Sequence, residues 1–309
     1  MTAGHAIGLR TLTNEYVDEP VSLEGSLPEW LTGTLVRNGP GKFETDDGPL
    51  QHWFDGLALI RRFGLDGSAD TVRFSARFLR SSEYEHVRQT GSLKTGQFGT
   101  AHTDSYLEHL RDIVGGELTD NASIGIDHGR VRARSDGGTG VDRSSATGET
   151  EVSGTSRANG GPQLPEGPPR ELVALTETPN GVAFDTESLD AAGAVTRDGG
   201  LEVTGVLGHP HETRDGDAIL NMGMQLGPTG EYVLYRQPRG GSPERIGSHA
   251  ASNPAYFHSF GLSRRYAVLY ESPYRANTLS LLTPGAFSDA YEWDPEAASR
   301  FIVFDRSTG

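Results

Sequence analysis

Short apolar segments separated by turn residues constrain the fold of this chain most strongly. Glycine, proline, asparagine and aspartate recur between them at intervals of roughly ten residues, a pattern typical of sandwiches, barrels and propellers. Glycine alone contributes 41 of the 309 residues, well above its usual share of roughly 7 %. The sequence therefore predicts an all-β protein, and no exact repeat chooses among these three architectures.

The apolar segments give a set of expected strands and one expected helix. Residues 57–63 are expected to pair with residues 71–80 across a turn at 64–67. The expected helix covers residues 103–114, where the apolar side chains approximate a stripe along one side. The other expected strands are residues 33–37, 171–176, 182–185, 218–222, 231–236, 266–270, 277–282 and 300–305.

The composition changes between residues 129 and 170. Glycine, serine, threonine, aspartate, arginine and proline dominate this stretch, and it contains no aromatic residue. Such a composition cannot bury a core of its own. Because the β pattern resumes at residue 171, we interpret the stretch as a low-complexity, solvated insertion within one domain that spans residues 1–309. A boundary between two domains is the competing interpretation.

Charge and cysteine content exclude several classes of protein. The chain has 42 acidic and 27 basic residues, a net charge of −15 and no cysteine. Disulfides, iron–sulfur clusters and thiolate zinc sites are excluded, which leaves histidine, aspartate and glutamate as metal ligands. A net negative chain without a basic cluster repels phosphates, so we expect no nucleic-acid partner. No apolar run is long enough to span a bilayer and no signal peptide is evident, so we expect a cytoplasmic location.

The basic residues are almost all arginine, because only Lys42 and Lys94 are lysines. An acidic, lysine-poor surface stays soluble when high salt screens its charges, so the chain resembles proteins of salt-loving hosts. GC-rich codon usage is an equally weighted explanation.

The C-terminal residues suggest an incomplete element. Residues 300–305 form an apolar strand pattern, and the turn residues 306–309 follow it. A hairpin is begun here without its second strand, and proteins normally cover an exposed apolar strand. We therefore expect a truncated or split chain.

Two of the ten histidines have contexts that suit metal binding. His209 lies in a Gly-His-Pro-His-Glu segment, and His258 lies among aromatic residues next to an expected strand. An imidazole buried in apolar surroundings is a suitable neutral ligand for a transition metal. A hydrogen-bonded structural histidine is the alternative for both. His211 is expected to be structural, because Pro210 interrupts the strand geometry that would align it with His209.

A series of blocks resembles one known family, the carotenoid cleavage oxygenases. This family includes apocarotenoid oxygenases, β-carotene oxygenases and the retinal pigment epithelium isomerase. The blocks follow one another in order and at compatible spacing outside the insertion. They are residues 37–44, 52–56, 74–84, 118–122, 174–178, 208–211 and 257–262.

The resemblance implies a seven-bladed β-propeller that holds ferrous iron, Fe(2+), with four histidines. By position, His209 and His258 match two of these ligands. Glu177 matches a glutamate that accepts the distal N–H of a ligand histidine and so orients it. The resemblance implies no catalytic residue beyond the metal ligands. The 38–41 turn and Asp55, which is expected to cap backbone amides, have structural interpretations.

The implied activity is cleavage of a double bond in a carotenoid or apocarotenoid by dioxygen, which gives two carbonyl products. Family members carry two further ligand histidines in a C-terminal portion. We therefore expect this chain to be the N-terminal part of the propeller, with its C-terminal blades missing, and activity to need a complementing C-terminal chain.

Family members also take substrate from membranes through an apolar patch, for which residues 103–114 are the candidate here, although several polar side chains interrupt them. Membrane association is thus an alternative to a purely cytoplasmic location. A different class of function is also open: an inactive fragment or a non-catalytic polyene-binding β-protein. An unrelated propeller lectin or hydrolase rests on fold analogy alone.

Overall fold

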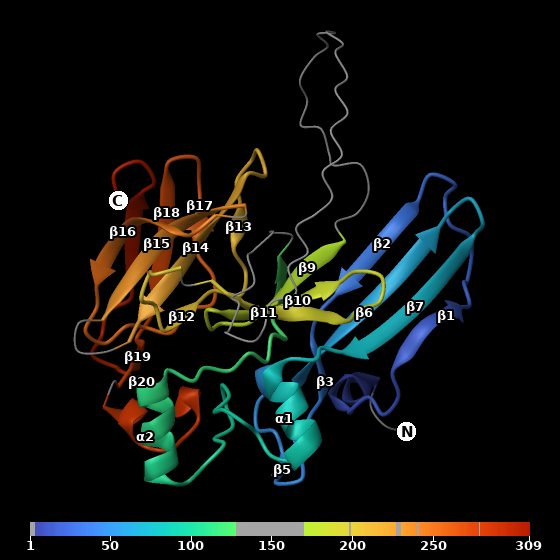
Figure 1. Cartoon of the computed structure of the whole chain (residues 1–309). Helices are drawn as coiled ribbons and strands as arrows, with labels where there is room; N and C mark the ends of the chain where they lie inside the picture. Colours follow the sequence, from blue (N-terminus) through green and yellow to red (C-terminus); the bar gives the residue numbers. More distant parts are fainter. Residues whose placement is uncertain (1–3, 128–169, 198, 227–229, 240, 278) are drawn as a thin grey trace, which may run out of the picture.

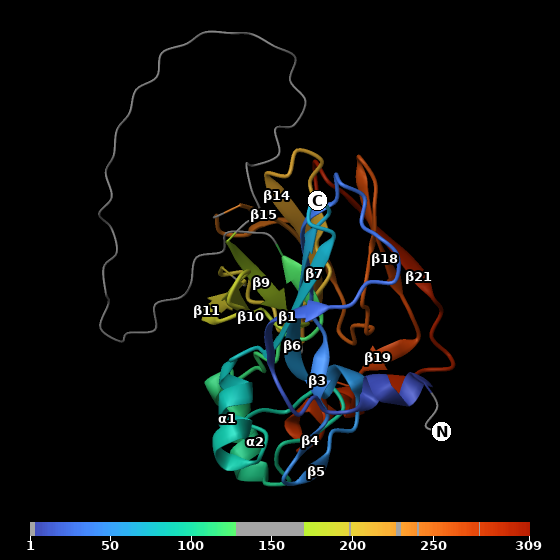
Figure 2. The same ribbon diagram turned by 90° about the vertical axis from the view of Figure 1, so that its right-hand side faces the viewer.

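The computed structural model describes residues 4–127, 170–197, 199–226, 230–239, 241–277 and 279–309. These residues form mainly antiparallel sheets, and two helices lie together at one end of the molecule (Figures 1 and 2). The expected all-β class is confirmed as a mostly β fold. The strands of the described residues do not close into a ring, so the expected seven-bladed propeller is not seen as a closed structure.

The N-terminal sheet has the order β1-β7-β6-β2, and β3 also pairs with β6. The expected pairing of residues 57–63 with 71–80 is confirmed, since Leu59 faces Phe78 and Asp66 faces Thr71. The expected turn at 64–67 is wrong, because residues 64–66 continue as strand and pair on their other side with β2. The bounds are β1 (Tyr16–Val21), β2 (Thr32–Arg37), β3 (Pro40–Lys42), β6 (Leu57–Asp66) and β7 (Thr71–Phe78), with β4 (Glu44–Thr45) and β5 (Gly48–Pro49) forming a separate pair.

The second sheet is an antiparallel meander in the order β11-β10-β9-β8. It comprises β8 (Gly125–Asp127), β9 (Glu171–Leu175), β10 (Asn180–Asp185) and β11 (Ala191–Thr196). The strands expected at 171–176 and 182–185 are confirmed. The predicted insertion connects β8 to β9, which pair with each other. Residues 128–169 lie outside the described residues, so the insertion and the single-domain assignment stay predictions.

The third and fourth sheets share the largest hydrophobic core. Met222, Tyr232 and Leu234 pack there with Leu269 and Phe304, and all five are buried. The third sheet is β12 (Gly205–Val206), β14 (Ala218–Gln225), β15 (Glu231–Pro238) and β16 (Glu244–Ala250), and β13 (His211–Glu212) pairs with β14. The fourth sheet is β17 (Gly261–Leu262), β18 (Tyr266–Glu271) and β21 (Arg300–Asp305), next to the pair β19 (Tyr274–Ala276) and β20 (Tyr291–Trp293). The strands expected at 218–222, 231–236 and 266–270 are confirmed.

Strand β21 matches its expected bounds and pairs along its whole length with β18. The expectation that this strand has no partner is therefore wrong, because β18 pairs with one of its two edges. On the outer face of this sheet Phe301 and Val303 remain 72 % and 56 % exposed. Tyr270, which faces Phe301 across the pair, is also exposed. The sheet thus presents a row of apolar side chains that the described residues do not cover.

The residues that the structure describes form two α-helices, α1 (Ser82–Thr90) and α2 (Tyr106–Gly115). The expected helix at 103–114 is confirmed as α2, which begins after the cap Ser105. Helix α1 was not expected, although Ser81 caps its first turn and Gly91 ends it in the left-handed conformation.

The strand expected at 277–282 is wrong. Residues 280–282 form a single 3₁₀ turn, η3 (Ser280–Leu282), and the Asn277 side chain accepts a hydrogen bond from Leu279 N. The other 3₁₀ turns are η1 (Gly4–Leu9), η2 (Trp53–Asp55) and η4 (Phe287–Ala290).

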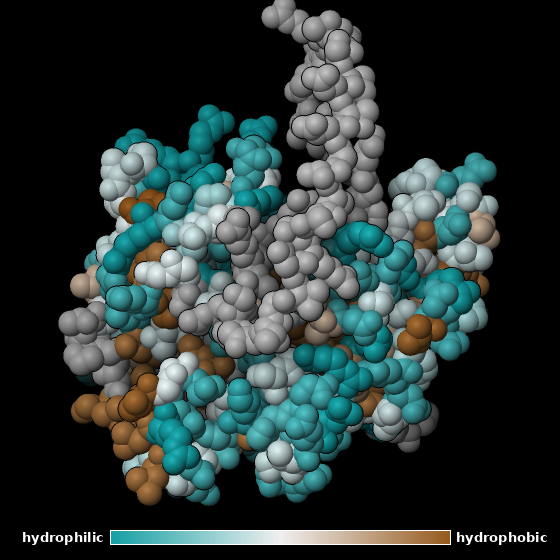
Figure 3. Space-filling model, viewed as in Figure 1, coloured by the Kyte–Doolittle hydropathy of each residue, from teal (hydrophilic) through white to brown (hydrophobic). Residues whose placement is uncertain are grey.

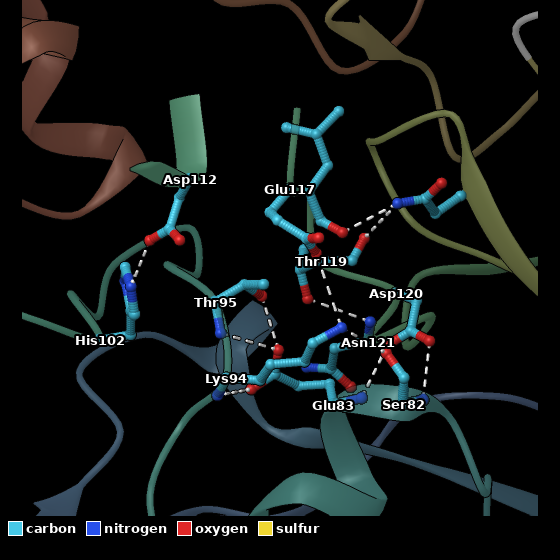
Figure 4. A network of polar contacts seen from close by, with 12 residues as sticks. Ser82, Glu83, Lys94, Thr95, His102, Asp112, Glu117, Thr119, Asp120 and Asn121 are labelled. Atoms are coloured by element: carbon cyan, nitrogen blue, oxygen red, sulfur yellow. Dashed lines mark hydrogen bonds and ion pairs between the residues drawn. The ribbon is translucent and has the colours of Figure 1, made fainter. Parts of the chain in front are cut away.

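A polar network ties α1 to the segment that precedes β8 (Figure 4). The Asp120 carboxylate accepts hydrogen bonds from the backbone amides of Ser82 and Glu83 at the helix start. The buried Glu83 carboxylate accepts the Thr95 hydroxyl at 2.6 Å, and burial raises the pKa of this carboxyl. Asn121 accepts from the Ala58 amide at 3.0 Å and so joins the segment to β6. The family-like block at 118–122 is therefore a structural clamp.

Candidate metal centre

His258 lies in the connection between β16 and β17, outside any regular strand. Three hydrogen bonds donated by backbone amides fix this connection: Tyr256 N donates to Tyr274 O at 3.0 Å, Ala276 N donates to Pro254 O at 2.9 Å, and Ala255 N donates to the Tyr232 side-chain hydroxyl at 2.6 Å. Tyr232 in turn donates to the buried Glu271 carboxylate, which pairs with two arginines. The segment before His258 is thus held in place by strand β19 and by a buried polar network.

Glu177 follows β9 and is held by its neighbours in sequence and space. The Thr178 hydroxyl donates to Thr119 O at 2.8 Å, and Val206 N donates to Glu177 O at 2.9 Å. These contacts place the glutamate between the clamp at 118–122 and strand β12. The carboxylate accepts a short hydrogen bond from Nδ1 of His258. The structure therefore brings together Glu177 and His258, which the family resemblance assigned to one site.

His209 reaches the same place from the loop after β12. Two glycines, Gly208 and Gly125, allow this loop to pass close to β8. A Cβ atom on Gly125 would overlap the Gly208 carbonyl oxygen, and a Cβ atom on Gly208 would lie 2.7 Å from Ile124 Cγ2. The ring centroids of His209 and His258 are 5.0 Å apart at an angle of 77°. Both predicted ligands and the predicted orienting glutamate thus meet in one cluster.

The electrostatics of the two imidazoles differ. Burial and the neighbouring His258 lower the pKa of His209, and Glu177 opposes this shift. The hydrogen bond to Glu177 raises the pKa of His258, and partial burial opposes that shift. With Nδ1–H of His258 directed at Glu177, Nε2 is the nitrogen of this ring that can bind a metal.

The expectation of buried imidazoles is only partly met. His209 is exposed, and the side chain of His258 is 39 % exposed. One side of His258 is covered, because the Phe54 ring stacks on it with centroids 5.7 Å apart and planes inclined by 15°. Phe98 continues this aromatic wall from Phe54 to Tyr256. The sequence analysis noted that His258 lies among aromatic residues, of which Tyr256 is one, but it did not place Phe54 or Phe98 at the site.

The residues with predicted structural roles have structural contacts. His211 Nε2 lies 3.1 Å from Phe260 O, and its ring packs edge-on against the Phe260 ring. The buried Asp55 carboxylate accepts the amides of His52 and Gly99 and so caps backbone groups as expected. Asn38 Nδ2 donates to Ala122 O and to Gly125 O. The Asn38 contacts help to hold β8, against which the His209 loop packs.

The cluster fits part of a metal site. Imidazole nitrogens are suitable ligands for iron and similar metals, and a carboxylate behind one of them is a common way to orient such a ligand. Across the described ranges, no group of three or more histidine, cysteine, aspartate or glutamate side chains is arranged to hold a metal ion. The family resemblance implies four histidine ligands, of which His209 and His258 would supply two.

A comparison of the sequence with family models agrees with the mostly β fold and with the cluster of two histidines and a glutamate. Residues 9–309 match the family described as retinal pigment epithelial membrane protein. The chain belongs to this family, the carotenoid cleavage oxygenases. The resemblance read from the sequence blocks is thus confirmed.

Curated relatives carry carotenoid dioxygenase names. The mitochondrial carotenoid-cleaving dioxygenase of Macaca fascicularis is 30 % identical over 307 residues, which cover 92 % of this chain and 48 % of that protein. Beta,beta-carotene 15,15'-dioxygenase of Rattus norvegicus is 28 % identical over 301 residues, which cover 88 % of this chain and 44 % of that protein. The chain spans about half the length of the curated relatives it matches.

Solved structures of Synechocystis apocarotenoid oxygenase have the same fold. One variant gives a TM-score of 0.71 at 21 % identity and covers 99 % of this chain and 57 % of that chain. The cobalt-substituted form gives a TM-score of 0.70 at 22 % identity and covers 97 % of this chain and 56 % of that chain. The open arrangement of sheets here therefore corresponds to part of a larger carotenoid oxygenase fold.

Proposed function

We propose that this chain provides part of an iron(II)-dependent oxygenase that uses dioxygen to cleave a double bond of a carotenoid or apocarotenoid into carbonyl products. Family membership and the names of the relatives support the substrate class. The observation that carries the proposal is the convergence of His209, His258 and Glu177 in one cluster.

His209 and His258 would hold the metal, and Glu177 would keep Nδ1 of His258 protonated and Nε2 available. When bound, iron(II) supplies the redox chemistry of dioxygen, and no external electron donor is needed if both oxygen atoms enter the products. The wall of Phe54 and Phe98 next to His258 gives a polyene an apolar surface that excludes water and positions one double bond.

We propose that the other two metal ligands come from outside residues 1–309, in a complementing polypeptide with the C-terminal blades of a seven-bladed propeller. The exposed apolar face of β18 and β21, with Tyr270, Phe301 and Val303, supports this proposal. Such a face would be covered by a further β-sheet in a closed propeller, where each sheet packs against its neighbours. The joint surface would be larger and more apolar than that of a standard protein contact.

A peripheral membrane contact through α2 belongs to the same proposal. Leu107 and Val114 are 80 % and 83 % exposed, and Leu279 beside η3 is 74 % exposed. His109 Nε2 lies 2.9 Å from Leu281 O, so α2 and η3 adjoin, and apolar residues gather over this corner of the surface (Figure 3). No helix within the described ranges has the length and hydropathy to cross a bilayer. A polyene substrate partitions into lipid, so an apolar surface at this end suits its transfer to a cytoplasmic enzyme.

A non-catalytic polyene-binding protein, or an inactive fragment, is the second candidate. The exposure of both histidines and the presence of only two clustered imidazoles among the described residues favour it. Such a protein would bind a polyene without metal and release no aldehyde.

Product analysis separates these candidates. The chain, purified with any co-purifying polypeptide, is incubated with an apocarotenoid in air, and aldehydes are measured by chromatography. We expect aldehyde formation that H209A and H258A abolish, whereas H249A, which changes an exposed histidine on β16, leaves it unchanged. Polyene binding without aldehyde formation would support the binding protein instead. Cleavage that survives both ligand variants would overturn the site assignment.

A further inference from the structure

The Glu177 carboxylate has two hydrogen-bond donors, one on each oxygen. Oε1 accepts from Nδ1 of His258, and Oε2 accepts from the Tyr256 hydroxyl at 2.8 Å. Both donors come from one short segment that is not part of a regular strand. The two residues are separated only by Phe257, and both side chains reach the same carboxylate. Glu177 is 18 % exposed, and its contacts therefore lie in a mostly desolvated setting.

The Tyr256 ring has little freedom to move its hydroxyl away. It lies 5.4 Å from Phe98, 5.7 Å from Tyr291 and 6.4 Å from Tyr274, centroid to centroid. The backbone amide of Tyr256 is also fixed, because it donates to Tyr274 O. Aromatic packing and a strand contact thus determine where the hydroxyl points.

A glutamate held at only one oxygen keeps considerable freedom, because rotation about its last bond is broad and roughly two-fold. A second donor on the other oxygen removes most of that freedom. In this cluster the second donor is the Tyr256 hydroxyl, and the first is the histidine that the glutamate orients. The direction of the His258 ring therefore depends on Tyr256 through Glu177.

We propose that Tyr256 is a positioning residue of the metal centre: its hydroxyl fixes Glu177, which holds Nδ1 of His258 and leaves Nε2 to bind the metal. This inference rests on the proposed function for its metal, but the orientation of His258 is a property of the chain itself. If Tyr256 served only to fill space in the aromatic cluster, a phenylalanine would replace it without effect on His258.

The variant that tests this is Tyr256→Phe, which removes one oxygen atom and keeps the ring packing. The matched control is Tyr274→Phe, which removes a hydroxyl from the same cluster, where it donates to Ser288 O at the long distance of 3.5 Å. Circular dichroism and thermal unfolding check the fold of both variants. If Tyr256→Phe lost the fold while Tyr274→Phe kept it, Tyr256 would have a structural role and the proposal would be overturned.

The first readout needs no metal. Nitrogen-15 NMR of the ¹⁵N-histidine-labelled chain, with the His258 signals assigned by their loss in H258A, reports which ring nitrogen carries the proton. We expect the Nδ1–H tautomer in the unmodified chain and in Tyr274→Phe. In Tyr256→Phe we expect a mixture of the two tautomers. An unchanged single tautomer in Tyr256→Phe would overturn the proposal.

The second readout is affinity for cobalt(II), titrated by absorbance on the chain with any co-purifying polypeptide. Loss of a contact that orients a metal ligand typically weakens binding by about 10–100-fold, and we expect a loss near the lower end in Tyr256→Phe and none in Tyr274→Phe. If H209A and H258A also left cobalt binding unchanged, the metal assignment would fail, and the tautomer measurement would still decide the role of Tyr256. If those two variants lost binding but Tyr256→Phe did not, only the role of Tyr256 would fail.

Discussion

The imidazole rings of His209 and His258 lie 5.0 Å apart, centroid to centroid, although one follows β12 and the other precedes β17. Their approach depends on backbone details far from the rings themselves. The loop of His209 passes close to β8 at two glycines, and the segment of His258 is held against β19. The geometry of the cluster is therefore set by the packing between sheets, which gives specific predictions.

Replacement of Gly125 by alanine should displace the His209 loop. A Cβ at this position would overlap the Gly208 carbonyl oxygen, and overpacking of this kind typically costs about 1–3 kcal/mol. We expect a lower free energy of unfolding in urea and a weaker affinity for cobalt(II). Gly33→Ala is the control, because open space surrounds its Cβ position and its effect should stay within about 0.5 kcal/mol. Equal effects of the two changes would contradict the packing argument.

Truncation of Leu234 should test the shared core of the third and fourth sheets. Leu234 is fully buried within this core, and Leu→Ala changes at such positions destabilise proteins by about 2–5 kcal/mol. Leu107→Ala changes the same residue type at an exposed position on α2 and should have an effect below about 0.5 kcal/mol. Urea unfolding measures both. A small loss for Leu234→Ala would mean that this core does not support the fold.

The sequence predicted most strands because apolar alternation and turn residues act locally. Strand β21 was placed at its observed bounds, whereas the turn between β6 and β7 was not, since pairing with β2 and β7 extends β6 beyond the glycine at 64 to Asp66. The apolar residues at 277–282 resembled a strand, yet local hydrogen bonds fold them into a turn. Helix α1 has a capping serine, Ser81, before its first turn and a glycine, Gly91, after its last. The apolar periodicity of the sequence did not indicate this helix.

Only the residues of the candidate site that lie in sequence blocks resembling the family could be predicted. His209, His258 and Glu177 were named from the sequence, and the structure brings them together. Their exposure could not be predicted, because it depends on the packing of loops and sheets that are far apart in the sequence. The contact between Tyr256 and Glu177 joins residues far apart in the chain, and no local pattern encodes it.

The exposed apolar side chains of α2 should bind lipid surfaces. We expect the chain to float with phosphatidylcholine vesicles and the double variant Leu107→Glu/Val114→Glu to bind at least about tenfold more weakly, since burial of each apolar side chain is worth about 1.5–3 kcal/mol. Val17→Glu/Leu35→Glu is the control, because it places the same charges on exposed apolar positions of the N-terminal sheet. Equal weakening by both double variants would indicate a general charge effect instead of a membrane patch.

Asp305 should contribute to stability in a pH-dependent way. Hydrogen bonds from Ser307 and contact with Arg265 lower the pKa of this carboxyl to about 2. A lowered pKa means that the stabilisation is present above the unfolded-state pKa of roughly 3.9 and is lost as the pH falls toward 2. Asp305→Asn should therefore flatten the fall of the unfolding midpoint between these pH values. Asp47→Asn, an exposed change in another loop, is the control, and an identical acid profile for Asp305→Asn and the unmodified chain would refute the assignment.

The assignment of His209 and His258 as iron ligands is tested most directly by the iron content of the protein, measured by elemental analysis after anaerobic purification with any co-purifying polypeptide retained. We expect about one iron per chain in the unmodified protein and in H249A, and a loss of most of it in H209A and in H258A. An absence of iron from the unmodified protein, or an iron content that both ligand variants leave unchanged, would contradict this assignment.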